Sequence, residues 1–296
     1  MSTISAAAVN ELRKKTDQPL MDCKKALTEA AGDMEKAIEL LRSWNAKATV
    51  KREGNETAEG RVGIFIDSTA AVAAILELRC ESAPSAKSDL YVKLVADLVE
   101  HAAKHNPTDV EAMLAQPFGT GTVKTRIEET VGLIREKMVV HRFEHLAGGV
   151  FGQYVHHDGT VGALLHCTGT GGTDEILRDV CAHVAAMNPL YLNPSEIPQA
   201  AKDKEKAFIL QQVQEGEKVA EEKAATDGKK FQPKNASIME KVVDGKLKSW
   251  MAEIALTEQP MANTAKYPGQ TVGQVLTKLG LTPAKFVRYK VGAVSK

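Results

Sequence analysis

The first 53 residues carry apolar side chains at helical spacing in three successive stretches. Ile4, Ala8 and Leu12 share one face of the first stretch. A Thr-Asp-Gln-Pro break follows, in which Pro19 suits the first turn of a second helix. We therefore predict a bundle of three short helices, which at about fifty residues is close to the lower limit of independent stability.

The periodicity changes after the polar, glycine-containing residues 45–60, which we interpret as a linker or a capping extension. Alternating segments rich in Val and Ile predict strands, helical spacing returns between them, and Asp158-Gly159 is a strong hairpin signal. The predicted strands are Arg61–Asp67, Ala71–Cys80, Val139–Leu146, Val150–His157, Val161–Cys167 and Phe286–Val291. The predicted helices are Leu90–Ala102, Val123–Met138, Asp174–Met187, Ile238–Ala255 and Thr271–Leu279. The order strand, strand, helix occurs twice, which predicts two related subdomains although no residue-level repeat is visible.

Residues 196–252 differ from the rest of the chain in their charge. They include 11 Lys or Arg and 10 Asp or Glu residues, with sparse apolar positions at helix-compatible spacing. A break at Asp227-Gly228 and Pro233 predicts a projecting helical hairpin with its tip near residues 227–234. A solvated charged arm and a partner-binding arm both fit this pattern.

The overall charge argues against two classes of partner. Lys and Arg number 38, as do Asp and Glu, so the formal net charge is zero. A sequence-independent nucleic-acid binder or a basic membrane-surface protein needs a cationic excess. Aromatic residues make up 5% of the chain, which disfavours stacking on single strands. We expect no direct nucleic-acid partner and no membrane partner.

Targeting signals and cysteine motifs are equally sparse. No apolar run reaches the roughly 20 residues of a membrane span, and the N-terminus does not resemble a secretory signal. The four cysteines have no CxxC spacing, which disfavours a zinc or thioredoxin-like site. We interpret them as small core residues of a cytoplasmic protein.

Two glycine-rich stretches resemble phosphate-binding loops incompletely. Residues 119–125 have Val123 where the P-loop pattern requires glycine before its lysine. Residues 169–172 lead to Asp174 where the dinucleotide pattern requires its third glycine. We therefore expect no nucleotide or other cofactor to be bound by this chain itself.

The histidines do not complete a catalytic or metal motif. His101 and His105 have the i, i+4 spacing of a zinc helix, but Ala102 stands where HExxH requires glutamate. We interpret the pair as part of a solvated helix face and predict no metal site. Because no stretch assembles a nucleophile, a base and oxyanion donors, the sequence indicates a binding protein rather than an enzyme. A Cys–His enzyme using Cys80 and His156 is a further alternative.

Five segments resemble bacterial elongation factor Ts, in the same order nearly from end to end. The Leu-Arg-x-x-Thr motif followed by Met-Asp-Cys-Lys-Lys-Ala-Leu is highly specific. The segments are VNELRKKTDQPLMDCKKAL (Val9–Leu27), GDMEKAIELLR (Gly32–Arg42), HVAAMNPLYL (His183–Leu192), EKVVDGKLKSWMAEIALTEQP (Glu240–Pro260) and QTVGQVLTKLG (Gln270–Gly280).

The resemblance implies an α+β fold with an N-terminal three-helix ubiquitin-associated-like bundle. Two related α+β subdomains with antiparallel sheets would follow, with an inserted helical hairpin that matches the family's coiled coil. We expect domain boundaries at residues 1–54, 55–147 and 148–296, with the hairpin at about 196–236. The C-terminal helical module of some members is expected to be absent.

The resemblance also implies guanine-nucleotide exchange on the GTPase elongation factor Tu. The chain would bind the GDP form, perturb its Mg²⁺ and phosphate site, and promote GDP release so that GTP can bind. Carried over by position, Arg13, Leu20 and Met21 would contact the nucleotide-binding domain of the GTPase. His156 matches a hairpin histidine that approaches the GTPase. A core position for Leu20 is the alternative, and homodimerisation remains open.

One departure from the family concerns the loop after Cys80. Members typically read Thr-Asp-Phe-Val-Ala-Lys there, whereas this chain has Ser82, Ala83 and Pro84 after Glu81. Ala83 and Pro84 stand where an acidic and an aromatic side chain would wedge beside the Mg²⁺ site. The alternative function is therefore a GTPase-binding, chaperone-like module with weak or no exchange activity.

Overall fold

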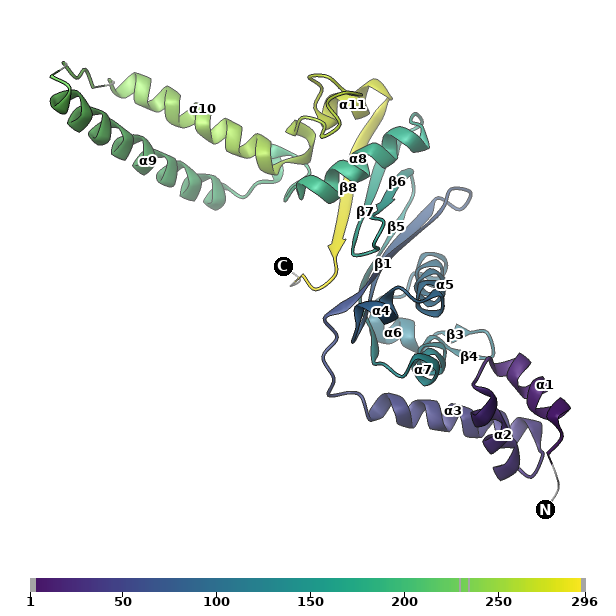
Figure 1. The fold of residues 1–296 in the computed structure, drawn as a ribbon. Helices are drawn as coiled ribbons and strands as arrows, with labels where there is room; N and C mark the ends of the chain where they lie inside the picture. The colour runs from purple at the N-terminus through teal and green to yellow at the C-terminus, as the bar shows by residue number, and fades with distance from the viewer. Residues whose placement is uncertain (1–3, 229, 234, 294–296) are drawn as a thin grey trace. The chain divides into compact units, whose positions relative to one another are not determined.

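Three helices near the N-terminus form the predicted bundle (Figure 1). The structure is a computed structural model that describes residues 4–228, 230–233 and 235–293. The helices are α1 (Ala6–Thr16), α2 (Leu20–Glu29) and α3 (Met34–Val50). Ser5 and Asp33 cap α1 and α3 by accepting backbone N–H groups. The buried core contains Leu12, Cys23 and Leu27, as the spacing predicts.

The predicted linker at residues 45–60 is wrong in its first part, because α3 continues through Val50. Asn45, within this polar stretch, is buried at 7% exposure. The helix continues because it packs against α7 (Val123–Ile134), a tertiary contact that composition does not reveal.

The first core half, residues 59–147, is a three-stranded antiparallel sheet covered by helices. The strand order is β1-β2-β5, and α5 and α7 contribute to its buried apolar cluster. Its further elements are β1 (Glu59–Asp67), β2 (Val72–Cys80), α4 (Ala83–Ala86), α5 (Asp89–His105), α6 (Val110–Ala115), β3 (Pro117–Phe118), β4 (Gly121–Thr122) and β5 (Met138–Ala147).

Two details of this half differ from the prediction. The helix expected over Val123–Met138 ends at Ile134, because Arg135 adopts a left-handed conformation with φ 63°. The short α4 and α6 and the β3–β4 pair were not predicted, since segments this short carry no periodic signal.

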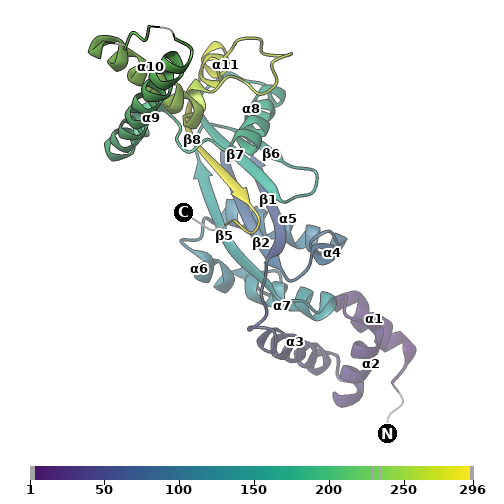
Figure 2. The same cartoon turned by 60° about the vertical axis from the view of Figure 1, so that its left-hand side comes forward.

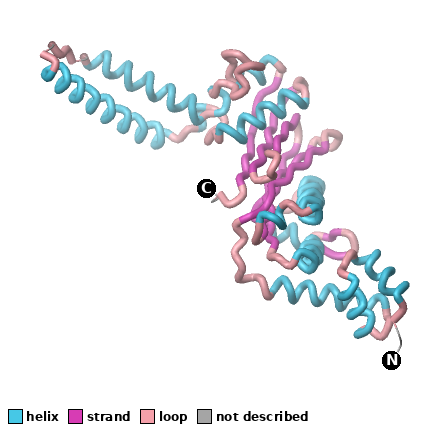
Figure 3. Tube along the Cα trace, viewed as in Figure 1, coloured by secondary structure: helices cyan, strands magenta, loops and turns pink. Residues whose placement is uncertain are grey.

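The second core half, residues 150–290, repeats the plan with the strand order β6-β7-β8. Its elements are β6 (Val150–Val155), β7 (Val161–Gly169), α8 (Asp174–Met187), the 3₁₀ turns η1 (Pro194–Glu196) and η2 (Leu256–Glu258), α11 (Val272–Lys278) and β8 (Leu281–Lys290). Helix α8 has the predicted bounds. Figure 3 shows the strands of both halves in magenta.

A helical hairpin interrupts the second half. Helices α9 (Gln199–Thr226) and α10 (Ala236–Ile254) lie side by side in Figures 1 and 2. Ile209, Val213 and Val243 form the small apolar cluster between them. The second arm thus extends beyond residue 236, and residues 229 and 234 of the predicted tip lie outside the described residues.

Contacts divide the chain into two units. One comprises Met1–Leu164 and Val287–Lys296, and the other comprises Leu165–Phe286. The first unit contains the bundle, the first core half and the β6–β7 turn, and the second contains α8, the hairpin and α11. The domain boundaries taken from the family resemblance remain predictions.

The structure reveals a residue-level repeat that the sequence analysis missed. In the first half, His101 Nε2 lies 2.8 Å from Gln116 Oε1. In the second half, His183 Nε2 lies 2.9 Å from Gln259 Oε1. Each histidine stands five residues before an Asn-Pro pair, and each glutamine is followed by proline. Insertion of the hairpin between His183 and Gln259 hides this correspondence from any search at fixed spacing.

The backbone around these pairs repeats as well. Asn106 and Asn188 end α5 and α8 in the left-handed conformation, with φ 43° and 50°. Thr122 and Thr271 begin α7 and α11 with a capping box. The first residue of each of these two helices donates its N–H at 3.0 Å to the carbonyl of the paired glutamine. The two halves are therefore built on one template.

The prediction of a solvated face for the histidines of α5 is wrong for His101. His101 is 5% exposed and bonded to Gln116, while His105 is exposed and stacks on it with ring centroids 4.1 Å apart. By contrast, all four cysteines are buried, as predicted. Among the described residues, no helix is both long and apolar enough to cross a membrane.

Candidate protein-docking surface

Two adjacent large apolar side chains of α2 are exposed to solvent. Leu20 is 45% exposed and Met21 is 69% exposed. Leu20 is the first residue of α2, outside the cluster that buries Cys23 and Leu27, so the alternative that it is a core residue is wrong. Met21 borders a shallow hollow of about 280 Å³ whose other lining residues are Lys24, Lys25, Thr28 and Glu29. An exposed methionine beside such a hollow is typical of a protein contact.

Arg13 lies in the last turn of α1 together with Lys14 and Lys15. All three side chains are exposed. Cations in this position complement the negative end of the helix dipole and leave the guanidinium available to an acidic partner surface. The bundle therefore combines an apolar anchor with a basic turn.

The connection between β2 and α5, residues 81–88, contains the second group of predicted residues. Ser82 caps α4, and both its N–H and its hydroxyl donate to the carboxylate of Glu136, at 3.0 and 2.6 Å. Glu81 in turn accepts the backbone N–H of Lys137, which is the main cause of its lowered pKa. These reciprocal carboxylate contacts fix the connection to the start of β5.

Ala83 and Pro84 form the first turn of α4. Ala83 is half-buried and Pro84 is exposed. Pro84 fits here because the first turn of a helix leaves its N–H groups without helical partners. Hydrogen bonds hold the connection in place, but it offers a methyl group and a proline ring where the family pattern has an acid and an aromatic side chain.

His156 lies at the β6–β7 turn, in a half-buried position. Its Nδ1 is 3.0 Å from the hydroxyl of Tyr154, and its ring contacts that of His157 edge to face. The turn is closed by a hydrogen bond from the N–H of Gly159 to the carbonyl of His156. The carbonyl of Gly159 accepts the N–H of Val62 on β1 at 2.8 Å, which holds the turn against the first sheet.

Both glycine-rich stretches are occupied by internal contacts. In residues 119–125, the hydroxyl of Thr125 accepts the N–H of Thr122, closing the start of α7. At Gly171, an added Cβ would lie 1.6 Å from the carbonyl oxygen of Leu279. These contacts give each stretch a structural role in the fold.

Comparison with known proteins decides the family. The sequence profile described as Elongation factor TS matches residues 85–293. The elongation factor Ts of Thiobacillus denitrificans is 39% identical over 293 residues, covering 99% of this chain and 93% of its own length. The elongation factor Ts of Bordetella petrii is 38% identical, covering 99% of this chain and 92% of its own length. That of Lactiplantibacillus plantarum is 35% identical, covering 99% of this chain and 93% of its own length.

The chain belongs to the elongation factor Ts family. It is therefore a translation elongation factor, as the motifs predict. Its mixed helical and antiparallel architecture agrees with the family fold, including the N-terminal helical region. The roles of the individual surface residues remain predictions.

Several residues that shape this elongation factor surface carry no signal in the sequence. Glu136 and Lys137 are far from residues 81–82 along the chain, and only the sheet brings them together. Tyr154 orients His156, yet it reads as an ordinary strand residue. Among the described residues, no group of three or more His, Cys, Asp or Glu side chains is placed to bind a metal.

Proposed function

We propose that this chain is a guanine-nucleotide exchange factor for elongation factor Tu. It binds the GDP form, perturbs the Mg²⁺ and phosphate site of the GTPase, and promotes GDP release so that GTP can bind. The observation that carries the proposal is 35–39% identity, over nearly the whole chain, to proteins named Elongation factor Ts. No covalent bond is made or broken, so the chain acts as a binding protein and not as an enzyme.

The proposed contact surface has three parts. Arg13, Leu20 and Met21 on the bundle bind the nucleotide-binding domain of the GTPase. The connection at Ser82, Ala83 and Pro84 and the turn at His156 provide contacts from the core. Their exposure supports this assignment for the bundle and for Pro84, and the hydrogen bonds of Ser82 and His156 keep the other two parts in a fixed conformation.

Linkage sets the energy that the exchange reaction requires. If the chain weakens GDP binding, GDP weakens binding of the chain by the same factor. A weakening of 10³–10⁴-fold corresponds to about 4–5.5 kcal/mol, which a protein interface of standard size can supply. Disturbing Mg²⁺, which bridges the phosphates and the GTPase, is an effective way to use that energy.

The linkage relation gives a direct test. Titration calorimetry should show tighter binding of the chain to nucleotide-free elongation factor Tu than to the GDP form. Equal affinities for the two forms would contradict an exchange function. Binding that is absent from both forms would contradict any role on this GTPase.

The bundle contact has its own test. Met21→Asp should weaken the complex by about 2 kcal/mol or more, because it places a charge where an apolar anchor is buried. The same substitution at Met187, which is 49% exposed on α8 outside the proposed surface, is the matched control. Unchanged affinity of the Met21 variant would show that the bundle contact is misassigned.

A second candidate function is supported by Ala83 and Pro84. Because neither side chain can act as an acidic and aromatic wedge, the chain would bind the GTPase as a chaperone-like module with weak or no exchange activity. Restoring Asp and Phe at these positions should then raise the rate of GDP release several-fold. An unchanged rate would favour an exchange mechanism that does not depend on this wedge.

A further inference from the structure

The bundle and the first core half meet along a seam between α3 and α7. The closest approach is at Gly132, where an added Cβ would lie 2.0 Å from Oδ1 of Asn45. Asn45 is 7% exposed, so the amide that faces Gly132 is buried. A glycine facing a buried amide lets two helices approach more closely than side chains normally allow.

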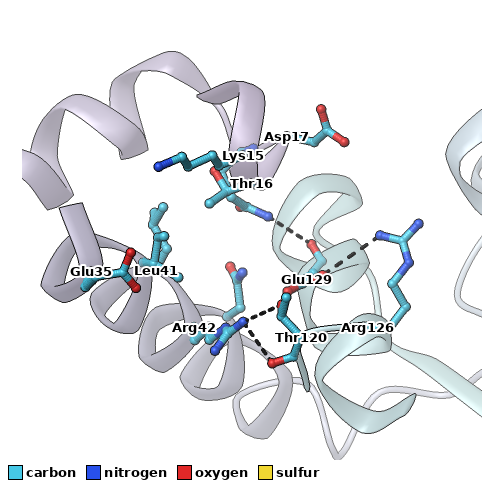
Figure 4. A pocket seen from close by; sticks show the side chains of 12 residues that line it. Lys15, Thr16, Asp17, Glu35, Leu41, Arg42, Thr120, Arg126 and Glu129 are labelled. Carbon is cyan, nitrogen blue, oxygen red and sulfur yellow. Dashed lines mark hydrogen bonds and ion pairs between the residues drawn. The ribbon is translucent and has the colours of Figure 1, made fainter. Parts of the chain in front are cut away.

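Polar contacts flank this close approach on both sides. Figure 4 shows the guanidinium of Arg42 on α3 donating to the hydroxyl of Thr120 at 2.9 Å. The side chain of Gln18, 3% exposed, donates to the carbonyl of Glu129 at 3.4 Å. These bonds tie α3 to the β3–β4 turn and the α1–α2 connection to the middle of α7.

Further contacts lie at the end of α3. Nε of Arg52 donates to the carbonyl of Arg135 at 2.8 Å. The ammonium of Lys137 donates to the carbonyl of Asn55 at 2.9 Å. The seam therefore extends from residue 18 to residue 55 of the bundle and its linker, and from residue 120 to residue 137 of the core.

The seam is polar and incompletely filled. It borders an open cavity of about 560 Å³ whose lining carries as many cations as anions. The cations are Lys15, Arg42 and Arg126, and the anions are Asp17, Glu35 and Glu129. Because this interface is not a dry apolar core, its geometry depends on the few directional contacts and on the absence of a side chain at Gly132.

We propose that Gly132 and Asn45 are positioning residues that hold the bundle at a fixed orientation on the first core half. This inference rests on the proposed function, in which the bundle and residues 82–84 bind one GTPase. When the bundle is held on the first core half, the bundle and residues 82–84 can contact the GTPase in one binding event. A bundle released from the seam binds only through a tether, and its effective concentration falls.

Spin labelling tests the docking directly. All four native cysteines are buried, so labels can be directed to Glu39→Cys on α3 and Glu111→Cys on α6, which replace exposed residues. Electron–electron double resonance should give one narrow distance distribution for the otherwise wild-type chain. A broad distribution would overturn the proposal, because the bundle would then be mobile without any substitution.

Substitutions at the seam test the coupling. Gly132→Leu should broaden the distribution and weaken binding to elongation factor Tu about 10-fold or more. Gly216→Leu, the same change within α9 at a glycine with open space around it, is the matched control. The double variant Gly132→Ala with Asn45→Ala should keep both the narrow distribution and the wild-type affinity. In that variant the Cβ added at position 132 occupies the space that the Asn45 amide has left.

The outcomes separate this inference from the proposed function. A Gly132→Leu chain with a broad distribution but wild-type affinity would overturn the positioning role while leaving the proposed function intact. A wild-type chain that does not bind the GTPase would contradict the proposed function, and the distance distribution would still decide whether the bundle is docked. Circular dichroism of each variant verifies that α1–α3 remain folded.

Discussion

The two core halves share their internal supports and differ in their surface connections. Both contain a buried histidine–glutamine pair and a threonine-capped helix that returns to that glutamine. Between the central strand and its helix, the first half has residues 81–88 with α4, whereas the second half has a glycine-rich link at 170–173. The candidate docking residues 82–84 therefore lie in the connection at which the two halves differ. The shared parts stabilise the fold, and the different parts are available for function.

The central strands show the same contrast at one matched position. Both β2 and β7 have nine residues, and Glu77 of β2 corresponds to His166 of β7. Glu77 is fully buried, and its two carboxylate oxygens each lie 2.7 Å from a guanidinium, one of Arg79 and one of Arg142. These arginines also donate to the carbonyls of Ala293 and Lys290. In the first half, Glu77 and its two arginines thus form an ionic clamp that holds β8 and the residues after it. At the matched position the second half has the partly exposed imidazole of His166.

The largest expected effect comes from removing this clamp. Glu77→Ala should reduce the free energy of unfolding by about 3–5 kcal/mol, because two arginines lose the buried partner between them. His166→Ala, at the matched and partly exposed position, should cost less than about 1 kcal/mol. Equilibrium unfolding in urea measures both, and equal costs would show that the halves are not specialised here.

A smaller difference is expected between the paired histidines. His183 is bonded through both ring nitrogens, to Gln259 and to the N–H of Ala262 at 3.0 Å. His183→Ala should cost about 2–3 kcal/mol, and His101→Ala about 1–2 kcal/mol, because the first leaves a backbone donor unpaired as well. Urea unfolding of each variant, followed by circular dichroism, checks the order. A larger cost at His101 would contradict it.

The two connections should also respond differently. Gly171→Ala should cost about 2 kcal/mol, since the new methyl group meets the backbone carbonyl of Leu279. Glu136→Ala removes two hydrogen bonds to Ser82 and should cost about 1 kcal/mol. It should also alter GDP release, because residues 82–84 lose their anchor. A Glu136 variant with unchanged exchange would separate this connection from function.

The smallest expected effect is a loss of stability at acidic pH. Burial lowers the pKa of both His101 and His183, so the folded chain binds fewer protons than the unfolded chain near the ordinary histidine pKa of about 6.5. Stability should therefore fall as the pH drops below that value. His183→Gln should reduce the loss more than His101→Gln, because His183 is the more completely enclosed. Thermal melts between pH 7.5 and 5.5 measure the difference, and no difference would contradict it.

Much of the architecture could be predicted from periodicity and capping residues. Helix α8 begins after Thr173 and ends at Asn188-Pro189, and both signals are local. The extension of α3 to Val50 could not be predicted, because packing on α7 rather than composition stabilises it. The His–Gln repeat was hidden because its members are brought together only by the fold.

The candidate surface divides in the same way. Leu20 and Met21 could be selected from sequence, since adjacent apolar residues cannot both face one helical core. The carboxylate of Glu136 beneath Ser82 could not, because it comes from a different element. Sequence thus identifies exposed surface residues better than it identifies the residues that position them through hydrogen bonds.

We propose that this chain acts by opening the nucleotide site of elongation factor Tu. Stopped-flow fluorescence of labelled GDP leaving the cognate GTPase tests it most directly. We expect a release rate that rises with chain concentration to a plateau well above the spontaneous rate, and a much smaller rise with Met21→Asp at equal concentration. Release that stays at the spontaneous rate when the GTPase is saturated with wild-type chain would contradict the claim.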